Sequence, residues 1–411
     1  MGSTTGQRLK AAPEAVSVWN IIQPPMRILY VADGRSPIAQ NWIRHFVERG
    51  DEVFLASTFA CSLDFPIKEM ELTPVAFSSM KKVSQRPGTA PARTVGLRTA
   101  IRQWFGPITI RNAAGRLKTF IERAKPDLVH AMRIPYEGML AADAYSGVPL
   151  LISTWGNDFT LQGPSTSLMR HYTRWTMQVA DALHADCRRD VRLANEWGFG
   201  IKKPSLVAPG NGGIRSDVFH PPAEPVREPV IVNPRGFRPY VRNDIFFRAI
   251  PRVLAKHPHA KFLFALMAGE PHAEKWIQEL KIGHAVELLP HLSHDQMADI
   301  LRRAQIVASP SLHDGTPNSL LEGIACGCFP VAGDLESIRE WITSGKNGLL
   351  FNPNDENSIA GAILAAIEEN SLREQAADFN REMIADRAEY KSNMKRAEQF
   401  YERILSKQIY S

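Results

Sequence analysis

Short apolar runs alternate with longer amphipathic stretches along most of the chain from Met26. The first run, RILYVAD, is followed by an amphipathic stretch near 38–49 and then by a second run, EVFLAS. Apolar positions in the longer stretch recur at helical spacing, whereas the β-branched runs predict strands. These runs are continuously apolar, as expected of strands in a parallel sheet that is covered on both faces. The pattern therefore predicts a doubly wound α/β fold.

Two series of such strands follow one another. In the first half, further strands are expected in PDLVHAM, PLLISTW, DALHAD and SLVAPG, with a helical stretch near 136–146. In the second half, strands are expected in VIVNPRG, KFLFALMAG, AVELLP, QIVASP and CFPVAG. Helices are expected after these later strands, near 243–257, 272–281, 294–303, 317–326 and 336–343. The pattern stays helical from about 355 to 408, so we expect the last helix to leave the second domain.

The chain is expected to divide into two domains at a stretch rich in Pro and Glu. With 411 residues, 44% of them hydrophobic, it is long enough for two ordinary cores. Residues 220–229 are expected to link a first Rossmann-like domain, 26–219, to a second, 230–390, across a cleft. A C-terminal helix, 391–411, is expected to pack on the first domain. Residues 1–25 are expected to form a flexible leader.

Cysteine usage and hydropathy favour a reducing compartment. Four cysteines in a chain of this length do not make a disulfide framework. Cys326 and Cys328 lie in an apolar stretch without a second pair, so we expect burial rather than metal binding or redox chemistry. No apolar run approaches the ~18 residues of a membrane-spanning helix, and the opening residues lack the apolar core of a signal peptide. The expected location is cytoplasmic.

Basic residues are concentrated in one part of the first domain. Residues 81–125 contain eleven Lys or Arg and one acid, Glu122, although the net charge of the whole chain is only +6. Apolar residues are interleaved with them at helical spacing, at Leu97, Ile101, Trp104 and Phe105. One interpretation is that the segment binds the anionic inner surface of a membrane or an anionic acceptor. The other is that it is a solvated helix whose apolar stripe packs on the domain core. Charge alone also permits nucleic acid, but no recognition motif supports it.

The loop and helix that follow QIVASP offer an anion site. Ligands of open parallel sheets bind at the carboxyl ends of strands. Pro317 can open a helix there and Gly327 can close it. Its first turn would present backbone N–H groups and the positive end of the helix dipole to a diphosphate, at Asn318, Ser319 and Leu320.

Two acidic residues flank this helix start, eight positions apart. Glu322 lies one turn into the helix and can accept hydrogen bonds from both hydroxyls of a ribose, while Asp314 lies in the preceding loop. The alternative is a capping box, in which Ser319 and Glu322 satisfy only the helix terminus.

A second candidate element is the loop after VIVNP, which holds Arg235, Arg238 and Arg242. Guanidinium groups match the oxygens of a pyrophosphate, and the loop follows a strand that is expected to end at the interdomain cleft. We therefore expect at least one of the three arginines to contact phosphate.

In the first domain the opening strand ends in ADGRSP rather than in the GxGxxG of dinucleotide-binding proteins, which disfavours a dehydrogenase. The turn Gly34, Arg35 and Ser36 can approach a substrate closely. His130 and Asp158 also lie near strand ends and are candidates for catalysis, although a structural role for the histidine is equally open. No Ser-His-Asp order, HExxH or paired CxxC is present, so a mechanism without metal or other cofactor is expected.

Together, these residues resemble the retaining nucleotide-sugar glycosyltransferases of family 4, which have the GT-B fold. The segment SLHDGTPNSLLEGIACGCFPV is similar to the E-x7-E region of that family. The resemblance implies that Glu322 holds the ribose, that Asp314 meets the hydroxyls of the donor sugar, and that the backbone around Ser319 and Leu320 holds the diphosphate. Gly315 is also expected to bind the donor. Asp314 stands where the family has Glu, so its side chain is one methylene shorter.

Other segments extend the resemblance. PRGFRPYVRN resembles the phosphate loop in which the family has Arg and then Lys, which implies that Arg235 stabilises the leaving group. STWGND matches an acceptor-side strand, but Trp155 stands where many relatives have His, so a histidine cannot act there. The implied reaction moves a hexose or N-acetylhexosamine from a UDP-sugar to a glycan, lipid-linked or small-molecule acceptor. Alternatives are a nucleotide-sugar 2-epimerase or hydrolase, and a non-catalytic nucleotide-sugar-binding protein.

Overall fold

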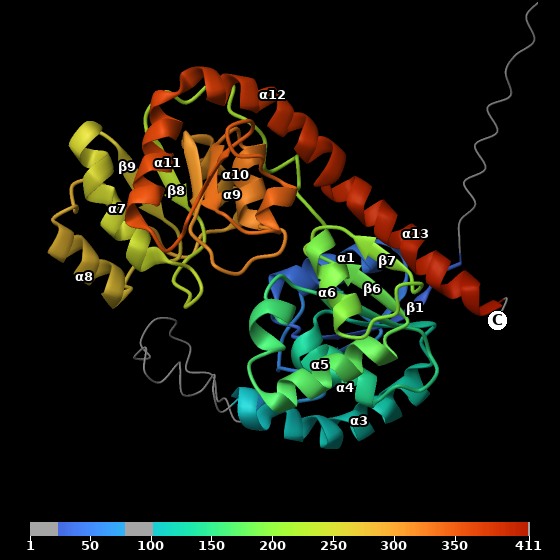
Figure 1. Cartoon of the computed structure of the whole chain (residues 1–411). Helices are drawn as coiled ribbons and strands as arrows, with labels where there is room; N and C mark the ends of the chain where they lie inside the picture. Colours follow the sequence, from blue (N-terminus) through green and yellow to red (C-terminus); the bar gives the residue numbers. More distant parts are fainter. Residues whose placement is uncertain (1–23, 79–101, 410–411) are drawn as a thin grey trace, which may run out of the picture.

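The computed structural model describes residues 24–78 and 102–409, which form two α/β domains (Figure 1). In the first domain they form a seven-stranded parallel sheet in the order β3-β2-β1-β4-β5-β6-β7. Its strands are β1 Arg27–Ala32, β2 Glu52–Ser57, β3 Glu69–Leu72, β4 Leu128–Ala131, β5 Leu150–Thr154, β6 Ala182–Ala185 and β7 Ser205–Val207. The predicted doubly wound architecture is confirmed for this half.

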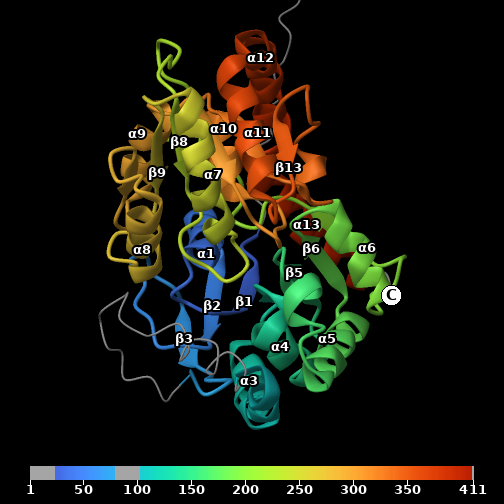
Figure 2. The same ribbon diagram turned by 60° about the vertical axis from the view of Figure 1, so that its left-hand side comes forward.

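Helices cover both faces of this sheet. They are α1 Pro37–Arg49, α3 Ile110–Ala124, α4 Met139–Asp143, α5 Ser167–Val179 and α6 Arg188–Glu196, with single turns η2 Gly106–Thr109, η3 Ile134–Gly138 and η4 Asp158–Gln162. Successive residues of β1 alternate between two cores: Leu29 and Val31 pack under α3, α4 and α5, whereas Ile28 and Tyr30 pack under α1. Figures 1 and 2 show α3, α4 and α5 on the side of this domain farthest from the second domain.

The second domain repeats the plan. Its described residues form a six-stranded parallel sheet in the order β10-β9-β8-β11-β12-β13. The strands are β8 Val230–Asn233, β9 Lys261–Phe264, β10 Val286–Leu288, β11 Ile306–Ser309, β12 Phe329–Gly333 and β13 Leu349–Phe351. The helices are α7 Asn243–Lys256, α8 Pro271–Leu280, α9 His294–Arg302, α10 Asn318–Ala325, α11 Glu356–Glu368 and α12 Asn370–Arg387. One core lies under α7, α8 and α11, and the other lies under α9 and α10.

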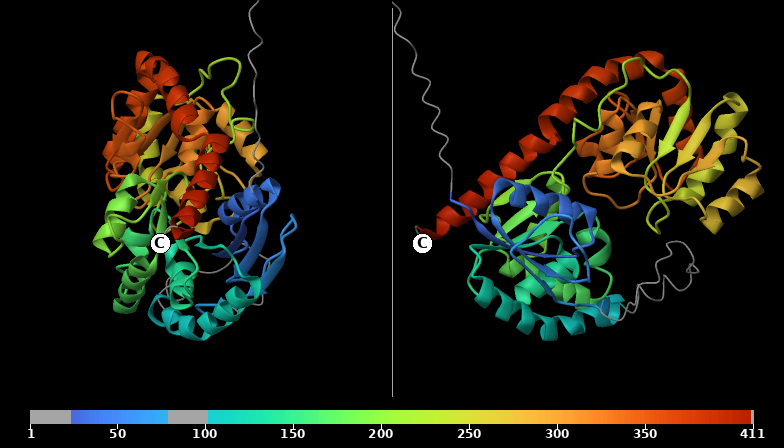
Figure 3. Two further views of the ribbon diagram at one scale, coloured as in Figure 1. Left: turned by 90° about the vertical axis from the view of Figure 1, so that its right-hand side faces the viewer. Right: turned by 180° about the vertical axis from the view of Figure 1, so that it is seen from behind.

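The chain crosses between the domains twice, and the first crossing comes earlier than predicted. Ile214 and Phe219 pack in the core of the second domain, so the crossing lies before them and not at 220–229. Proline content misplaced the boundary, because the Pro-rich stretch is an exposed segment of the second domain. The second crossing separates α12 from α13 Tyr390–Ile409. Met394 and Phe400 of α13 pack beside α1, so the predicted return of the C-terminal helix is confirmed (Figure 3).

Three short elements differ from the expected pattern. β3 and β13, which lie at sheet edges, were not predicted. The helix expected near 336–343 is a single 3-10 turn, η5 Ile338–Glu340. The leader and much of the basic segment, 79–101, lie outside the described residues.

Among the described helices, none has both the length and the apolar composition needed to cross a membrane. All four cysteines are free thiols, and Cys326 and Cys328 are buried, as expected. Burial raises the pKa of Cys326 to about 12 and raises that of Cys328 as well, so neither thiol is set up as a nucleophile.

Candidate functional site

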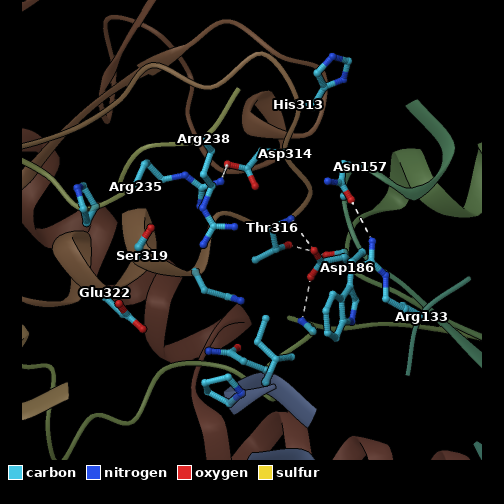
Figure 4. A pocket seen from close by; sticks show the side chains of 18 of the residues that line it. Arg133, Asn157, Asp186, Arg235, Arg238, His313, Asp314, Thr316, Ser319 and Glu322 are labelled. Atoms are coloured by element: carbon cyan, nitrogen blue, oxygen red, sulfur yellow. Dashed lines mark hydrogen bonds and ion pairs between the residues drawn. The ribbon is translucent and has the colours of Figure 1, made fainter. Parts of the chain in front are cut away.

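A cavity of about 480 Å³ lies between the two domains, where the carboxyl ends of strands from both sheets meet (Figure 4). The side chains used below come from both sides of it: Arg133, Trp155 and Asp186 from the first domain, and Arg235, Arg238, Asp314, Asn318, Ser319 and Glu322 from the second. The sequence-predicted donor residues Arg235, Asp314 and Glu322 are thus brought to one place. The position follows the general rule for ligands of open parallel sheets.

The domains touch directly beside this cavity, backbone against backbone. A Cβ atom added to Gly156 would lie 1.7 Å from the Gly315 amide nitrogen, so no side chain fits at this contact. Gly315, which was expected to bind the donor, does not line the cavity and instead contacts the first domain. The Asp186 carboxylate joins the two sides by accepting hydrogen bonds from the Gly210 and Thr316 amides, at 2.8 and 3.2 Å.

Arg189, at the start of α6, reinforces the same contact. Its guanidinium donates to the Asp314 carbonyl oxygen at 2.8 Å, to the Gly156 carbonyl oxygen at 2.8 Å and to the Ser337 hydroxyl at 3.1 Å. Its charge is balanced by Asp190 at 2.7 Å, and both side chains are buried. A buried pair of this kind fixes geometry more than it adds stability. The loop that holds Asp314 is therefore positioned by the first domain as well as by its own.

The first turn of α10 supplies donors to the cavity, although fewer than expected. The Asn318 amide donates to the Thr316 carbonyl oxygen and the Leu320 amide to the Pro317 carbonyl oxygen. Leu320 is fully buried in the core and lines no part of the cavity, so the diphosphate contact implied for it is withdrawn. Among the described residues, the Ser319 amide has no hydrogen-bond partner. It is the backbone donor of this turn that is left for an anion.

The polar side chains of this turn also face the cavity without partners. The Ser319 hydroxyl and the Asn318 side-chain oxygen are buried and make no hydrogen bond to the described residues. The alternative of a capping box between Ser319 and Glu322 is therefore wrong. The N-cap of α10 is Pro317 rather than Ser319, and no side chain caps this helix start. Buried polar atoms are normally satisfied, so these two oxygens indicate a ligand.

Glu322 lines the cavity one turn further into α10. Burial raises the pKa of its carboxyl to about 8, although the nearby Arg235 acts in the opposite direction. At neutral pH the side chain is largely protonated in this form, and it can both donate and accept a hydrogen bond. That suits a pair of neighbouring hydroxyl groups such as those of a ribose.

The arginine loop divides into two residues that line the cavity and one that does not. Arg235 and Arg238 line it, and Arg235 forms an ion pair with Asp314 at 2.9 Å (Figure 4). Arg242 points elsewhere and pairs with Asp244 at the start of α7 at 2.9 Å, so its expected role in donor binding is withdrawn. The loop reverses at Gly236, whose φ of 65° is in the left-handed region. Because of this turn, the side chains of Arg235 and Arg242 point in different directions.

On the first-domain side, Asp158 acts on Arg133 rather than on a substrate. Asp158 is fully buried and lines neither the cavity between the domains nor the smaller cavity within the first domain. It accepts hydrogen bonds from the Ile134 and Trp155 amides, each at 3.1 Å, and from the Arg133 guanidinium at 2.8 Å. Arg133 in turn lies 5.1 Å from the centre of the Trp155 ring. Asp158 is therefore a positioning residue, and Arg133 and Trp155 form the wall of the cavity.

His130 is not at the site, contrary to the catalytic role expected for it. It is fully buried, with one ring nitrogen 2.5 Å from the Tyr401 hydroxyl and the other 2.7 Å from the Ser153 hydroxyl. Burial, together with the neighbouring His184, lowers the pKa of His130 well below its usual value. The alternative, a hydrogen-bonded structural histidine, is the one the structure supports.

The turn after β1, which was expected to approach a substrate, packs against residues of its own domain. A Cβ on Gly34 would lie 2.4 Å from the Cys61 sulfur, so the close approach expected there is to Cys61. Arg35 pairs with Asp33 at 2.8 Å. Ser36 caps α1 and also lines a second, smaller cavity.

Three residues of the site escaped the sequence reasoning as candidates: Arg133, Asp186 and Thr316. Arg133 lies two residues after β4 and Asp186 directly follows β6, so the rule that placed the other candidates at strand ends also applies to them. Thr316 gave no such signal, because its contact with Asp186 depends on how the domains meet. Among the described residues, no group of three or more His, Cys, Asp or Glu side chains is arranged to hold a metal ion.

Two family patterns match the chain and together span most of it. Residues 33–210 match the glycosyl transferase 4-like domain, and residues 215–383 match the glycosyl transferases of group 1. The chain belongs to the family 4-like glycosyltransferases. The resemblance noted in its sequence is thereby confirmed, and the boundary between the two matches agrees with the first crossing in the structure.

Curated relatives match over part of the length. D-inositol 3-phosphate glycosyltransferase of Rhodococcus opacus is 26% identical over 193 residues, 43% of either chain. The gpi3 subunit of phosphatidylinositol N-acetylglucosaminyltransferase of Schizosaccharomyces pombe is 24% identical over 40% of this chain and 36% of its own. The chain thus spans about two-fifths of the length of these relatives.

Solved structures match nearly end to end in fold. Sucrose-phosphate synthase of Thermosynechococcus elongatus superposes with a TM-score of 0.71 at 14% identity, over 92% of this chain and 99% of its own. HepE of Anabaena, in complex with UDP and glucose, superposes with a TM-score of 0.67 at 13% identity, over 91% and 98%. The predicted GT-B fold is confirmed.

Proposed function

We propose that this glycosyltransferase moves a hexose or N-acetylhexosamine from a UDP-sugar to an acceptor hydroxyl with retention of anomeric configuration. One observation supports this most directly: Arg235, Arg238, the start of α10 and Glu322 converge on a single cavity between two domains. Cationic groups and an unpartnered amide suit the diphosphate, and Glu322 suits the ribose.

The residues also suit the chemistry of the bond that breaks. As the bond between the sugar C1 and the diphosphate oxygen breaks, negative charge grows on that oxygen. Fixed donors aimed at this charge lower the barrier, and each is worth ~2.7–4 kcal/mol in comparable sites. Arg235 is held in place by Asp314 at 2.9 Å. A bound diphosphate would accept hydrogen bonds from this guanidinium in place of Asp314. The Asp314 carboxylate would then accept hydrogen bonds from the sugar.

Retention follows from attack on the side of the leaving group. The acceptor oxygen forms a bond to C1 while the diphosphate leaves with the bonding electron pair and takes the acceptor proton. This scheme needs no protein base. It is compatible with Trp155, which has no titratable group, at the wall of the cavity.

UDP is proposed as the nucleotide because structural relatives hold it. HepE structures contain UDP, UDP with glucose, or UDP-glucose. A thermal-shift screen of nucleotides tests the base directly, since a ligand at 100 times its Kd stabilises the folded state by ~2.7 kcal/mol. The reaction itself is tested by NMR of the best donor with and without an acceptor extract. Retention predicts a product whose anomeric configuration matches that of the donor.

The two alternatives give different NMR results. Conversion of the donor alone to a 2-epimer or to free sugar would support an epimerase or hydrolase. Donor binding without turnover in any acceptor extract would support a non-catalytic binding protein. Acceptor-dependent consumption of the donor supports the transferase.

We also propose that the first domain contacts an anionic membrane. Trp104, Phe105 and Ile108 are more than half exposed, at 58%, 55% and 61%. They adjoin α3, whose buried stripe faces the core and whose exposed face includes Arg111 and Lys118. Exposed aromatic residues beside a basic helix face are typical of proteins that lie on a bilayer surface.

A further inference from the structure

A second cavity of about 330 Å³ lies within the first domain, beside the cavity assigned to the donor. Its lining comes from the loop after β1, from Arg102 and Gln103 before η2, and from the η3 turn with Tyr136 and Glu137. Arg133 and Trp155 line both cavities. A molecule held in the second cavity would therefore meet a donor at this shared wall.

Glu137 gives this cavity an unused hydrogen-bonding group. The residue is 3% exposed. One carboxyl oxygen accepts a hydrogen bond from the Thr58 hydroxyl at 2.9 Å, while the other has no partner among the described residues. Burial raises the pKa of this carboxyl, and Arg133 opposes the shift. Buried polar atoms are normally hydrogen-bonded, so an unpaired carboxyl oxygen in a cavity wall indicates a ligand hydroxyl.

Arg102 gives the cavity a positive charge that forms no ion pair with a carboxylate of the described residues, although it acts electrostatically on Glu137 in the same cavity. The other arginines nearby are paired, Arg35 with Asp33 and Arg133 with Asp158. Arg102 has no ion pair within the described residues, and its buried Nε atom lacks a partner there. A guanidinium with free donors matches the oxygens of a phosphate.

The Arg102 guanidinium lies over two aromatic rings, and the backbone turn that carries one of these rings is strained. Its central carbon lies 4.5 Å from the centre of the Tyr136 ring and 5.4 Å from that of Phe59. Tyr136 has φ 69° and ψ −56°, the conformation of a classic γ-turn, which is rare, strained and concentrated at functional sites. Gly106 lets the Tyr136 ring pack against the backbone at this point, because a Cβ on residue 106 would lie 2.9 Å from the ring.

We propose that this second cavity is the acceptor subsite and takes a hydroxylated acceptor that bears a phosphate. Arg102 binds the phosphate, Glu137 hydrogen-bonds a hydroxyl, and the hydroxyl to be glycosylated lies at the wall formed by Arg133 and Trp155. The inference rests on the proposed transferase function and names its acceptor class. The phosphate can belong to a small soluble molecule or to a lipid headgroup, and the chemistry of the cavity is shared by both.

Titration of the full-length protein with phosphate probes tests this assignment. The probes are inorganic phosphate, glycerol phosphate, and dihexanoyl phosphatidylglycerol below its micelle concentration, each added with UDP at saturation to fill the donor cavity. We expect Arg102→Gln to weaken binding of the probes at least ~10-fold, the effect of losing one charge-assisted contact of about 1.4 kcal/mol. Arg170→Gln, an exposed arginine of α5 that lies outside both cavities and the proposed membrane face, is the matched control and should bind as the wild type does.

The outcomes separate this proposal from the transferase proposal. Arg102-dependent binding supports the subsite, and the probe that binds more tightly, the soluble phosphate or the lipid, identifies the source. Equal binding by the wild type and Arg102→Gln, or no binding of any probe, overturns it. UDP affinity should be unchanged in Arg102→Gln, which also shows that the variant is folded. If UDP does not bind the wild type, the transferase proposal fails, while the same titrations without UDP still test the subsite.

Discussion

The Arg189 guanidinium of the first domain donates a 2.8 Å hydrogen bond to the carbonyl oxygen of Asp314 in the second. The Asp314 carboxylate in turn pairs with Arg235 inside the donor cavity. A single residue thus connects the contact between the domains to the group proposed to stabilise the leaving diphosphate. The geometry of the donor site therefore depends on how the two domains meet.

Gly156→Ala tests this dependence. The new Cβ would overlap the Gly315 backbone, which cannot move aside as a flexible side chain could, so the domains must separate slightly. We expect kcat/KM to fall by roughly 100-fold, because a misplacement of about 1 Å can cost that much. Steady-state kinetics measures the effect. Gly115→Ala in α3, where a Cβ meets nothing within 4 Å, is the matched control. Unchanged kinetics in Gly156→Ala would contradict the proposed dependence.

Glu322 should make stability depend on pH. Its carboxyl has an ordinary pKa of 4.5 when unfolded and about 8 when folded, so the folded state binds more protons between these values. The protonated Glu322 carboxyl therefore contributes to the free energy of unfolding at low pH. This contribution is lost as the pH rises, with a slope of at most ~1.4 kcal/mol per pH unit. We expect Glu322→Gln to reduce this loss between pH 5.5 and 7.5, as measured by urea unfolding.

The control for this prediction is Glu274→Gln, which replaces an exposed glutamate of α8. It should leave the pH dependence of the wild type unchanged. If Glu322→Gln and the wild type lose stability in parallel over the same interval, the shifted pKa is not the cause.

Trp104→Ala should weaken binding to anionic vesicles. Removing a large exposed aromatic side chain from the proposed membrane face takes away buried apolar area and an interfacial ring, so we expect a loss of roughly 10-fold in partition coefficient. Co-sedimentation with vesicles of phosphatidylglycerol and phosphatidylcholine measures it. Trp175→Ala, which removes an equally large side chain that is 43% exposed on α5, serves as the control. Equal effects of both substitutions would contradict a specific membrane face.

Much of the donor site could be predicted from the sequence because it follows from local rules. Glu322 and Ser319 lie on one helix start, and Arg235 lies just after a strand, so strand ends and helix termini bring them to the same edge of the sheet. Which arginine accompanies Arg235 could not be predicted. Arg238 and Arg242 are four positions apart, and the turn at Gly236 and the pairing with Asp244 decide their directions.

Contacts between distant parts of the chain were beyond sequence reasoning. His130 follows a strand-end pattern, but its side chain faces the core where α13 packs, and its partner Tyr401 lies 271 positions away. The contact of Gly156 with Gly315 joins the two domains, and the sequence around neither glycine indicates that it meets the other. The edge strand β3, EMEL, alternates glutamate with apolar residues, so it lacks the continuous apolar run that predicts a strand covered on both faces.

The central claim is that the cavity between the domains stabilises a leaving diphosphate through Arg235. The most direct test compares Arg235→Ala with Arg242→Ala, which removes an arginine of the same loop that points away from the cavity. We predict that Arg235→Ala lowers kcat at saturating donor by roughly 100-fold or more while the Kd for UDP changes far less, because the charge it meets develops in the transition state. Arg242→Ala should retain near-normal turnover. Equal losses of turnover and UDP affinity in Arg235→Ala, or equal losses of turnover in both variants, would contradict the claim.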